Sequence, residues 1–204
     1  MPRIARIVVP GVPHHVTQRG NRRQPTFFGD GDFARYVELL ADACSDAQVE
    51  VLAWCLMPNH VHLVLVPATS AGLAGAFKAA HQRYTWVINR RNGWQGHLWQ
   101  SRFYSCPLDG AHAISAIRYV ELNPVRARLV ATPEQWRWSS VRGRVLGTGD
   151  RLVRQQRPQF LDDIGDWLEF LAGGLRDEEA ELLRSHVLSG KALAGDRHHF
   201  RDRH

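Results

Sequence analysis

The chain has 204 residues, a formal net charge of +6 and a pI near 9.8. This length suits one well-buried domain with an appendage and is too short for two large domains. Of the 26 basic side chains, 24 are Arg, the side chain suited to bidentate phosphate contacts and to stacking on bases. Composition alone leaves two interpretations open, a nucleic-acid partner and a merely basic surface.

Cysteine usage and hydropathy exclude several classes of protein. Cys44, Cys55 and Cys106 lie far apart and form no C-x-x-C pair, so we expect reduced core thiols rather than a disulfide framework or a zinc knuckle. No apolar run approaches the roughly 20 residues of a membrane span, and the N-terminus lacks the apolar segment of a signal peptide. We expect a cytoplasmic protein with no membrane partner.

The first third of the chain predicts a strand, a helix and two further strands. Residues 14–19 have strand character, and residues from about 30 to 48 repeat apolar side chains at helical spacing. Residues 49–56 and 60–66 are both typical of strands, and the three residues between them suit a tight connection of antiparallel neighbours.

A second helix, a fourth strand and a third helix follow. We expect the helices at 73–91 and 109–122, closed by Asn92-Gly93 and by Pro124 respectively, and the strand at 98–107. The order βαββαβα predicts an α+β fold of the ferredoxin-like or RRM-like kind, an antiparallel sheet with helices on one face. The other face would then be available for a ligand.

Charge is distributed unevenly along the chain. Residues 1–160 carry 20 basic and 10 acidic side chains, whereas residues 161–204 carry 6 and 10. We therefore expect a main domain at 1–150, a basic linker at 151–160, and an acidic helical extension with a tail at 161–204. Two amphipathic stretches, 161–172 and 177–189, predict the helices of this extension.

Two histidines stand one residue apart at the start of the third strand, in the sequence MPNHVHLVLV. Residues i and i+2 of a strand point to the same face, so His60 and His62 should project side by side while Val61 points the other way. Two imidazoles at this spacing can share a metal ion. They can equally be hydrogen-bonded structural histidines, and the pair alone does not decide.

A tyrosine and an asparagine are spaced one helical turn apart in the sequence IRYVELNP. On a helix Tyr119 and Asn123 share a face, so that a hydroxyl and an amide oxygen are presented together. This suits a nucleophile beside a metal ligand. The alternative makes Tyr119 a core residue and Asn123 an ordinary helix terminus before proline.

Four separated segments together resemble the REP-associated tyrosine transposases, a group of single-tyrosine HUH transposases. The segments are HVTQRGNRRQ at 15–24, CLMPNHVHLVL at 55–65, GHLWQSRF at 96–103 and IRYVELNPVRARLV at 117–130. The resemblance implies that His60, His62 and Asn123 bind a divalent cation, Mg²⁺ or Mn²⁺, and that Tyr119 attacks DNA. It also implies a substrate of single-stranded DNA or of hairpins formed by repeated palindromes, and no small-molecule cofactor.

The chemistry fits these residue types. In-line attack on a phosphodiester needs a nucleophile and neutralisation of the phosphate charge, and a 5′-phosphotyrosine retains the bond energy needed to rejoin DNA. Six arginines are candidates for contacts with DNA, namely Arg19, Arg22, Arg23, Arg102, Arg126 and Arg128. The rival function is a non-catalytic module that binds single strands on its sheet. Monomer and homodimer both remain open.

Overall fold

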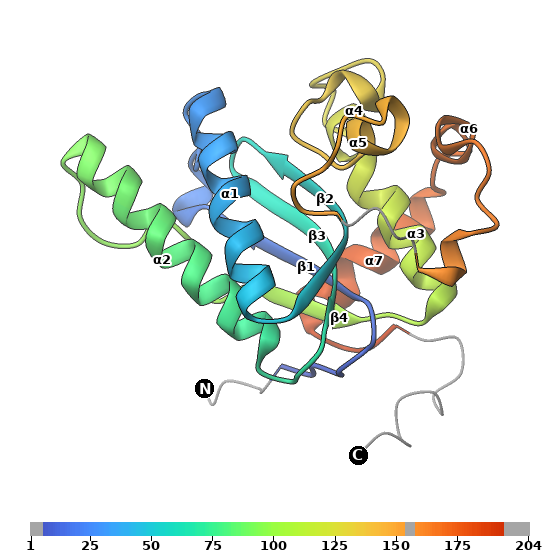
Figure 1. Cartoon of the computed structure of the whole chain (residues 1–204), viewed down its shortest axis with the longest axis horizontal. Coiled ribbons are helices and arrows are strands. Elements are labelled where there is room, and N and C mark those ends of the chain that lie inside the picture. Colours follow the sequence, from blue (N-terminus) through green and yellow to red (C-terminus); the bar gives the residue numbers. More distant parts are fainter. Residues whose placement is uncertain (1–5, 154–157, 194–204) are drawn as a thin grey trace.

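A four-stranded antiparallel sheet with helices against both faces organises the computed structural model, which describes residues 6–153 and 158–193 (Figure 1). The strands are β1 (His14–Arg19), β2 (Val49–Met57), β3 (His60–Pro67) and β4 (Tyr104–Pro107). Their order in the sheet is β2-β3-β1-β4. The α+β class and the predicted order of strands and helices along the chain are therefore confirmed.

The helices include the three predicted in the first 122 residues. They are α1 (Asp30–Asp46), α2 (Gly72–Asn92), α3 (Gly110–Glu121), α4 (Asn123–Arg126), α5 (Val141–Leu146), α6 (Trp167–Ala172) and α7 (Asp177–Ser189), with 3-10 turns η1 (Asn21–Arg23), η2 (Pro133–Gln135) and η3 (Gln159–Leu161). The predicted end of α2 is correct, because Gly93 closes it in the left-handed conformation with φ 64°.

The expectation that helices cover one face only is wrong. Val61, Leu63 and Leu65 of β3 point into a core shared with α1 and α2. The opposite face of the sheet packs against α3, α6 and α7, in a second core that contains Val64 and Ile117 (Figure 1). Among the described residues the sheet therefore has no open face on which a single strand could lie.

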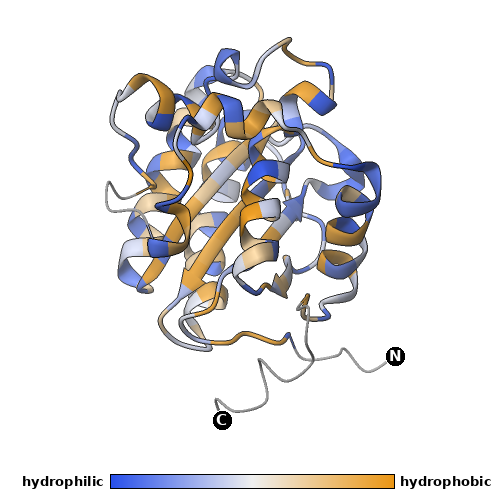
Figure 2. Ribbon diagram, turned by 90° about the vertical axis from the view of Figure 1, so that its right-hand side faces the viewer, coloured by the Kyte–Doolittle hydropathy of each residue, from blue (hydrophilic) through white to orange (hydrophobic). Residues whose placement is uncertain are grey.

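The sequence of β3 explains this burial on both faces. Between His60 and Val66 its residues are nearly all apolar, without the alternation of a strand that has one face in water. Figure 2 shows strands coloured as hydrophobic along their length, while the helices around them alternate between hydrophobic and hydrophilic segments. The two layers of helices together bury the apolar side chains on both faces of the sheet, whereas a single layer would leave one face exposed.

The fourth strand is shorter than predicted. It begins at Tyr104, because residues 98–103 form a loop in which Ser101 has a φ of 57°, a value that strand residues do not adopt. The apolar side chains of Leu98, Trp99 and Phe103 are buried in the core of α1 and α2 instead. The predicted helix at 161–172 is also shorter, and only its second half forms α6.

Residues 158–193 pack closely on α3 and β4. Leu161, Trp167, Leu171, Leu183 and Val187 are buried in the same core as α3. The chain then pairs with the end of the sheet, where the backbone N–H of Leu193 donates to the carbonyl of Pro107 at 2.9 Å. The predicted helix at 177–189 is confirmed as α7. The division of the chain at residues 150 and 160 stays a prediction.

Three further expectations concern the linker, the tail and the cysteines. Leu152 is buried and Val153 bridges to Val51 of β2, so part of the expected linker packs on the sheet. Residues 154–157 and most of the expected tail lie outside the described residues. The three cysteines are buried and free, as expected. No helix among the described residues is long and apolar enough to cross a membrane.

Candidate active site

Three histidines gather on the α3 face of the sheet. His60 and His62 project from the same face of β3, with ring centroids 4.9 Å apart, as the strand spacing predicts. His15 reaches them from the neighbouring strand β1, and its Nε2 lies 3.2 Å from Nδ1 of His62. Burial lowers the pKa of His60 and of His15 to about 4 and that of His62 well below its usual value. All three rings are therefore neutral at pH 7, the state in which imidazole binds metals.

Asn59 fixes the orientation and tautomer of His60. The amide nitrogen of Asn59 donates to the carbonyl of Arg23 at 2.9 Å, which leaves its Oδ1 to accept from Nδ1 of His60 at 2.6 Å. A neutral His60 with its proton on Nδ1 carries the lone pair on Nε2. Nε2 is therefore the atom that His60 offers to a cation.

Tyr119 lies against these rings from α3. Its ring centroid is 5.6 Å from that of His15 and 5.6 Å from that of His62, both in edge-to-face arrangements. The guanidinium carbon of Arg126 lies 4.9 Å from the centre of the tyrosine ring. Burial raises the pKa of Tyr119, and the charge of Arg126 opposes that rise. The phenol is thus protonated at rest and has a cation beside it to favour the phenolate.

Asn123 has a structural role that is compatible with ligand binding. It opens α4, and its Nδ2 donates to the backbone carbonyls of Tyr119 at 3.0 Å and of Val120 at 3.5 Å. Pro124 has no N–H to donate to the Val120 carbonyl, so the amide of Asn123 takes over that bond. This fixes the side chain and leaves Oδ1 as the atom available to a cation.

The structure separates the six arginines into groups. Arg19 pairs with His60 in the register of β1 and β3, and Arg126 lies over Tyr119. Arg22 and Arg23 are exposed in η1, next to Asn59. Arg128 is exposed just beyond α4. Arg102 lies elsewhere, in a cavity beneath α2. Five of the six arginines therefore belong to the segments that carry the histidines, Asn59 and Tyr119.

The remaining tyrosines and Glu121 have other roles. Tyr36 and Tyr84 are fully buried core residues, and the Tyr84 hydroxyl donates to the carbonyl of Thr26. Tyr104 is 40% exposed. Glu121 points away from Tyr119 and accepts hydrogen bonds from Ser140 at 2.6 Å and Trp167 at 2.7 Å. Glu121 is therefore a structural group rather than a metal ligand.

The segment Trp136–Arg144 packs into the protein. The indole nitrogen of Trp136 donates to the carbonyl of Leu56, and that of Trp138 donates to Asp30. These hydrogen bonds hold both indole rings against the protein, which argues against a platform for stacked bases on this segment.

Sequence patterns missed the contribution of α7 to this site. The charges of Arg184 and Glu181 both act on the pKa of Tyr119, in opposite directions. Nothing in the local sequence of α7 indicates this proximity, which arises from tertiary packing. A signal for Asn59 did exist, because an asparagine directly before a pair of inward histidines is placed to hydrogen bond to the first.

The donor atoms fit a divalent cation without forming a complete site by themselves. Among the described residues no group of three or more His, Cys, Asp or Glu side chains, the three histidines included, is arranged to hold a metal ion by itself. The set expected from the sequence is two imidazole nitrogens and one amide oxygen, and the internal hydrogen bonds of His60 and Asn123 leave the required atoms free for such a role. Substrate phosphate and water would supply further oxygens, as is usual for Mg²⁺.

Burial of neutral histidines predicts marked sensitivity to acid. His14 and His15 are both 0% exposed, and burial lowers the pKa of each to about 4. The unfolded chain, with a histidine pKa near 6.5, binds more protons between pH 6.5 and 4, so stability falls as the pH falls through this window. Each of these two rings should lower the free energy of unfolding by about 2 kcal/mol at pH 5, relative to pH 7.5.

Thermal unfolding at pH 7.5 and pH 5 measures this effect. The loss from His14 and His15 alone, about 4 kcal/mol, should lower the Tm by roughly 10 °C for a chain of this size, and the other buried neutral histidines add to it. His97→Gln, at an exposed position, should leave the difference between the two pH values unchanged. Equal Tm values at both pH values would contradict the assignment of buried neutral rings.

Comparison with known proteins assigns the family. The family model described as "Transposase IS200 like" matches residues 9–123, and the chain belongs to this family. The site described above lies almost wholly within the matched segment. The chain is therefore a DNA-processing enzyme of the transposase class, as the resemblance of its four segments indicated.

The same fold is found in a solved structure. A REP-associated tyrosine transposase bound to a REP hairpin is similar over 78% of this chain and 94% of its own, with a TM-score of 0.61 and 18% identity. A protein from Deinococcus radiodurans R1 described as a transposase is similar over 63% of this chain and 92% of its own, with a TM-score of 0.41 and 17% identity. No curated protein matches the chain.

Proposed function

We propose that the chain is a metal-dependent endonuclease and strand transferase for single-stranded DNA that acts through a 5′-phosphotyrosine at Tyr119. The observation that carries this proposal is the position of Tyr119, whose ring contacts His15 and His62 edge-on while Arg126 lies over it. A nucleophile, two candidate metal ligands on one strand, and a cation thus meet at one point of the fold.

The proposed reaction is a transesterification. The Tyr119 oxygen attacks phosphorus, the bond from phosphorus to the 3′ oxygen breaks, and a 5′-phosphotyrosine and a free 3′-OH result. Arg126 favours ionisation of the phenol, and Arg19 is placed beside His60 for the phosphate. A cation held by His60, His62 and Asn123 would supply charge neutralisation at the phosphate. The reverse reaction with another 3′-OH would join strands without ATP.

The proposed substrate is a DNA hairpin with adjacent unpaired nucleotides. The REP-associated tyrosine transposase that shares the fold is bound to a REP hairpin. This chain has the basic composition that such binding requires. The rival function, a module that stacks single strands on an open sheet, is disfavoured because α3, α6 and α7 cover the face that carries the histidines.

One experiment tests the reaction directly. The full chain is incubated with end-labelled single-stranded DNA and Mg²⁺ or Mn²⁺, and denaturing gel electrophoresis separates free DNA from a covalent protein–DNA band. A band that depends on the cation supports the proposal. Strong binding of DNA with no covalent band under any divalent cation would favour the non-catalytic function.

Loss of either strand histidine should remove cleavage. We expect His60→Ala and His62→Ala to lower the yield of covalent product by at least about 10²-fold, since even groups that only orient metal ligands are worth 10- to 100-fold. Chelation by EDTA should have the same effect. Arg35→Ala, at an exposed position of α1 outside this cluster, is the control. Full cleavage in EDTA would contradict the metal site.

A further inference from the structure

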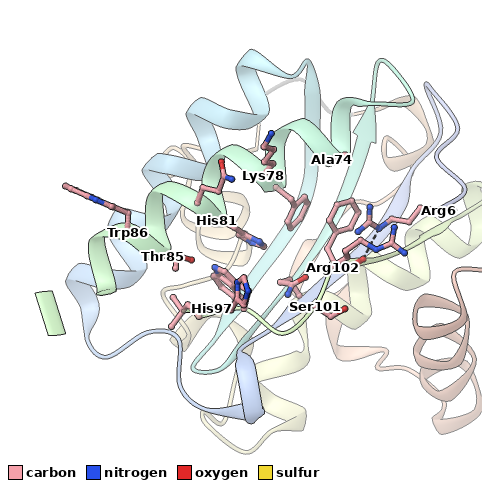
Figure 3. A pocket seen from close by; sticks show the side chains of 15 residues that line it. Arg6, Ala74, Lys78, His81, Thr85, Trp86, His97, Ser101 and Arg102 are labelled. Atoms are coloured by element: carbon pink, nitrogen blue, oxygen red, sulfur yellow. Dashed lines mark hydrogen bonds between the residues drawn. The ribbon is translucent and has the colours of Figure 1, made fainter. Parts of the chain in front are cut away.

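A cavity of about 480 Å³ lies between α2 and the loop that leads into β4, on the side of the sheet opposite Tyr119. Figure 3 shows Arg6 and Arg102 at one end of it, His97 at the other, and His81, Lys78 and Thr85 projecting from α2. The cavity is within the usual size range of small-molecule sites.

Two buried polar atoms of the lining have no hydrogen-bond partner among the described residues. Gln18 is 1% exposed, and its Nε2 donates to the carbonyl of Gln100 at 2.9 Å, which fixes the amide and leaves Oε1 without a donor. Trp99 is 7% exposed, and its indole Nε1 has no acceptor. A buried polar group without a partner destabilises a protein. The lining residues therefore include one unpaired acceptor and one unpaired donor.

Aromatic rings form much of the remaining lining. The ring of His81 stacks on Trp99 with centroids 4.3 Å apart, and Phe77 stacks on Phe103 with centroids 4.7 Å apart. Burial lowers the pKa of His81 to about 3, so this ring is neutral and does not repel a cation or attract an anion. A flat heterocycle with donor and acceptor atoms on its edge suits such a lining.

Two arginines lie at one end of the cavity. Arg6 and Arg102 both line it there (Figure 3), and the guanidinium of Arg6 stacks on Phe103 with its carbon 3.8 Å from the ring centre. Burial lowers the pKa of Arg6, and the charge of Arg102 lowers it further. Like charges held this close favour an anion between them, and a phosphate meets that requirement.

We propose that this cavity binds one unpaired nucleotide of the DNA substrate, with its base among the aromatic rings and its phosphate at Arg6 and Arg102. A base within a duplex uses its edge for pairing, so only an unpaired nucleotide has an edge free for the polar groups of the lining. This proposal rests on the proposed function in one respect only, namely that the bound strand is single-stranded DNA.

The path of β1 connects this cavity with the candidate active site. Gln18 and its neighbour Arg19 stand at the end of β1, where Arg19 pairs with His60 of β3. β4 pairs only with residues 14–17 of β1, so a loop rather than a strand borders β1 at this end. A single strand that passes the end of β1 could reach both sites.

Binding without divalent cations tests the proposal independently of cleavage. Fluorescence anisotropy with the full chain compares a labelled 12-nucleotide single strand with an abasic strand of the same length. We expect the strand with bases to bind at least about fivefold more tightly, the lower range for one stacked base. Thr85→Trp, which fills the cavity from the partly exposed surface of α2, should abolish this difference.

Charge at the cavity has its own pair of variants. Arg102→Gln should lower the slope of log affinity against log salt by about 0.7, the value for one phosphate on a single strand. Arg83→Gln removes a charge from an exposed residue of α2 outside the cavity lining and should change the slope less. If Thr85→Trp fails to fold, Gln82→Trp at an exposed lining position replaces it.

Several outcomes would overturn this assignment. Equal affinity of the wild-type chain for strands with and without bases would show an anion site only. A Thr85→Trp chain that keeps the full preference for bases would place the bound nucleotide elsewhere. A failed covalent-adduct assay together with a positive anisotropy result would leave the cavity assigned and refute only the proposed cleavage.

Discussion

Tyr119→Phe should abolish the covalent protein–DNA product while it preserves the fold and the affinity for DNA. Phenylalanine keeps the ring that contacts His15 and His62 and that lies under Arg126, so packing is retained. Only the oxygen that attacks phosphorus is lost. Removal of a nucleophile from other enzymes costs several orders of magnitude in rate, and we expect a loss of at least about 10³-fold here.

Tyr104→Phe is the matched control for this experiment. Tyr104 is 40% exposed at the start of β4, which makes it the most accessible alternative nucleophile among the four tyrosines of the chain. The control chain should form the product at the wild-type level. Anisotropy with uncleavable single-stranded DNA checks that both variants still bind. A product formed by the Tyr119→Phe chain and lost in the Tyr104→Phe chain would transfer the nucleophile role to Tyr104.

Local patterns were sufficient to predict the parts of the site that lie on single elements. The period of two along a strand placed His60 and His62 on one face, and the helical period placed Asn123 one turn after Tyr119. The hydrogen bond from Asn123 to the Tyr119 carbonyl confirms the second of these placements. What local periodicity could not supply is the set of contacts between distant elements, such as that of His15 with Tyr119.

The arrangement of layers was mispredicted although the sequence held a signal. β3 is nearly continuous in apolar residues, which is typical of a strand buried on both faces, yet the ferredoxin-like order of elements suggested one open face. The helices that cover the second face come partly from residues 158–193, whose acidic composition favoured an appendage. Their apolar residues, such as Trp167 and Leu171, predict the packing of these helices better than their charge does, because the apolar face of an amphipathic helix packs against the core.

Shortening the chain to residues 1–159 should give an insoluble or unfolded protein. Two outcomes follow from the sequence: acidic helices that shield a basic surface, whose removal would tighten DNA binding, and helices that complete the core. The structure favours the second, because Leu161, Trp167, Leu171, Leu183 and Val187 are buried against α3. At about 1.5–3 kcal/mol for each large apolar side chain, their loss matches or exceeds the 5–15 kcal/mol by which domains are usually stable.

A buried carboxylate adds to the expected loss. Glu121 is 0% exposed and accepts from Ser140, Arg144 and Trp167, the last at 2.7 Å. Without residues beyond 159, one carboxylate oxygen of Glu121 loses the Trp167 donor on α3, the helix that carries Tyr119. Trp167→Phe should reproduce this part alone and cost about 1–3 kcal/mol, whereas Leu168→Ala, at an exposed position of α6, should cost little.

Solubility, thermal unfolding and DNA affinity of the shortened chain decide between the two outcomes. Leu168→Ala in the full chain is the control and should unfold close to the wild-type temperature. A folded 1–159 chain that binds single-stranded DNA more tightly at low salt, and loses the advantage as ionic strength screens the exposed charges, would establish shielding by the acidic helices. Aggregation of the 1–159 chain, with intact behaviour of the control, would make α6 and α7 part of the catalytic domain, since the helix that carries Tyr119 would have no second layer to hold it against the sheet.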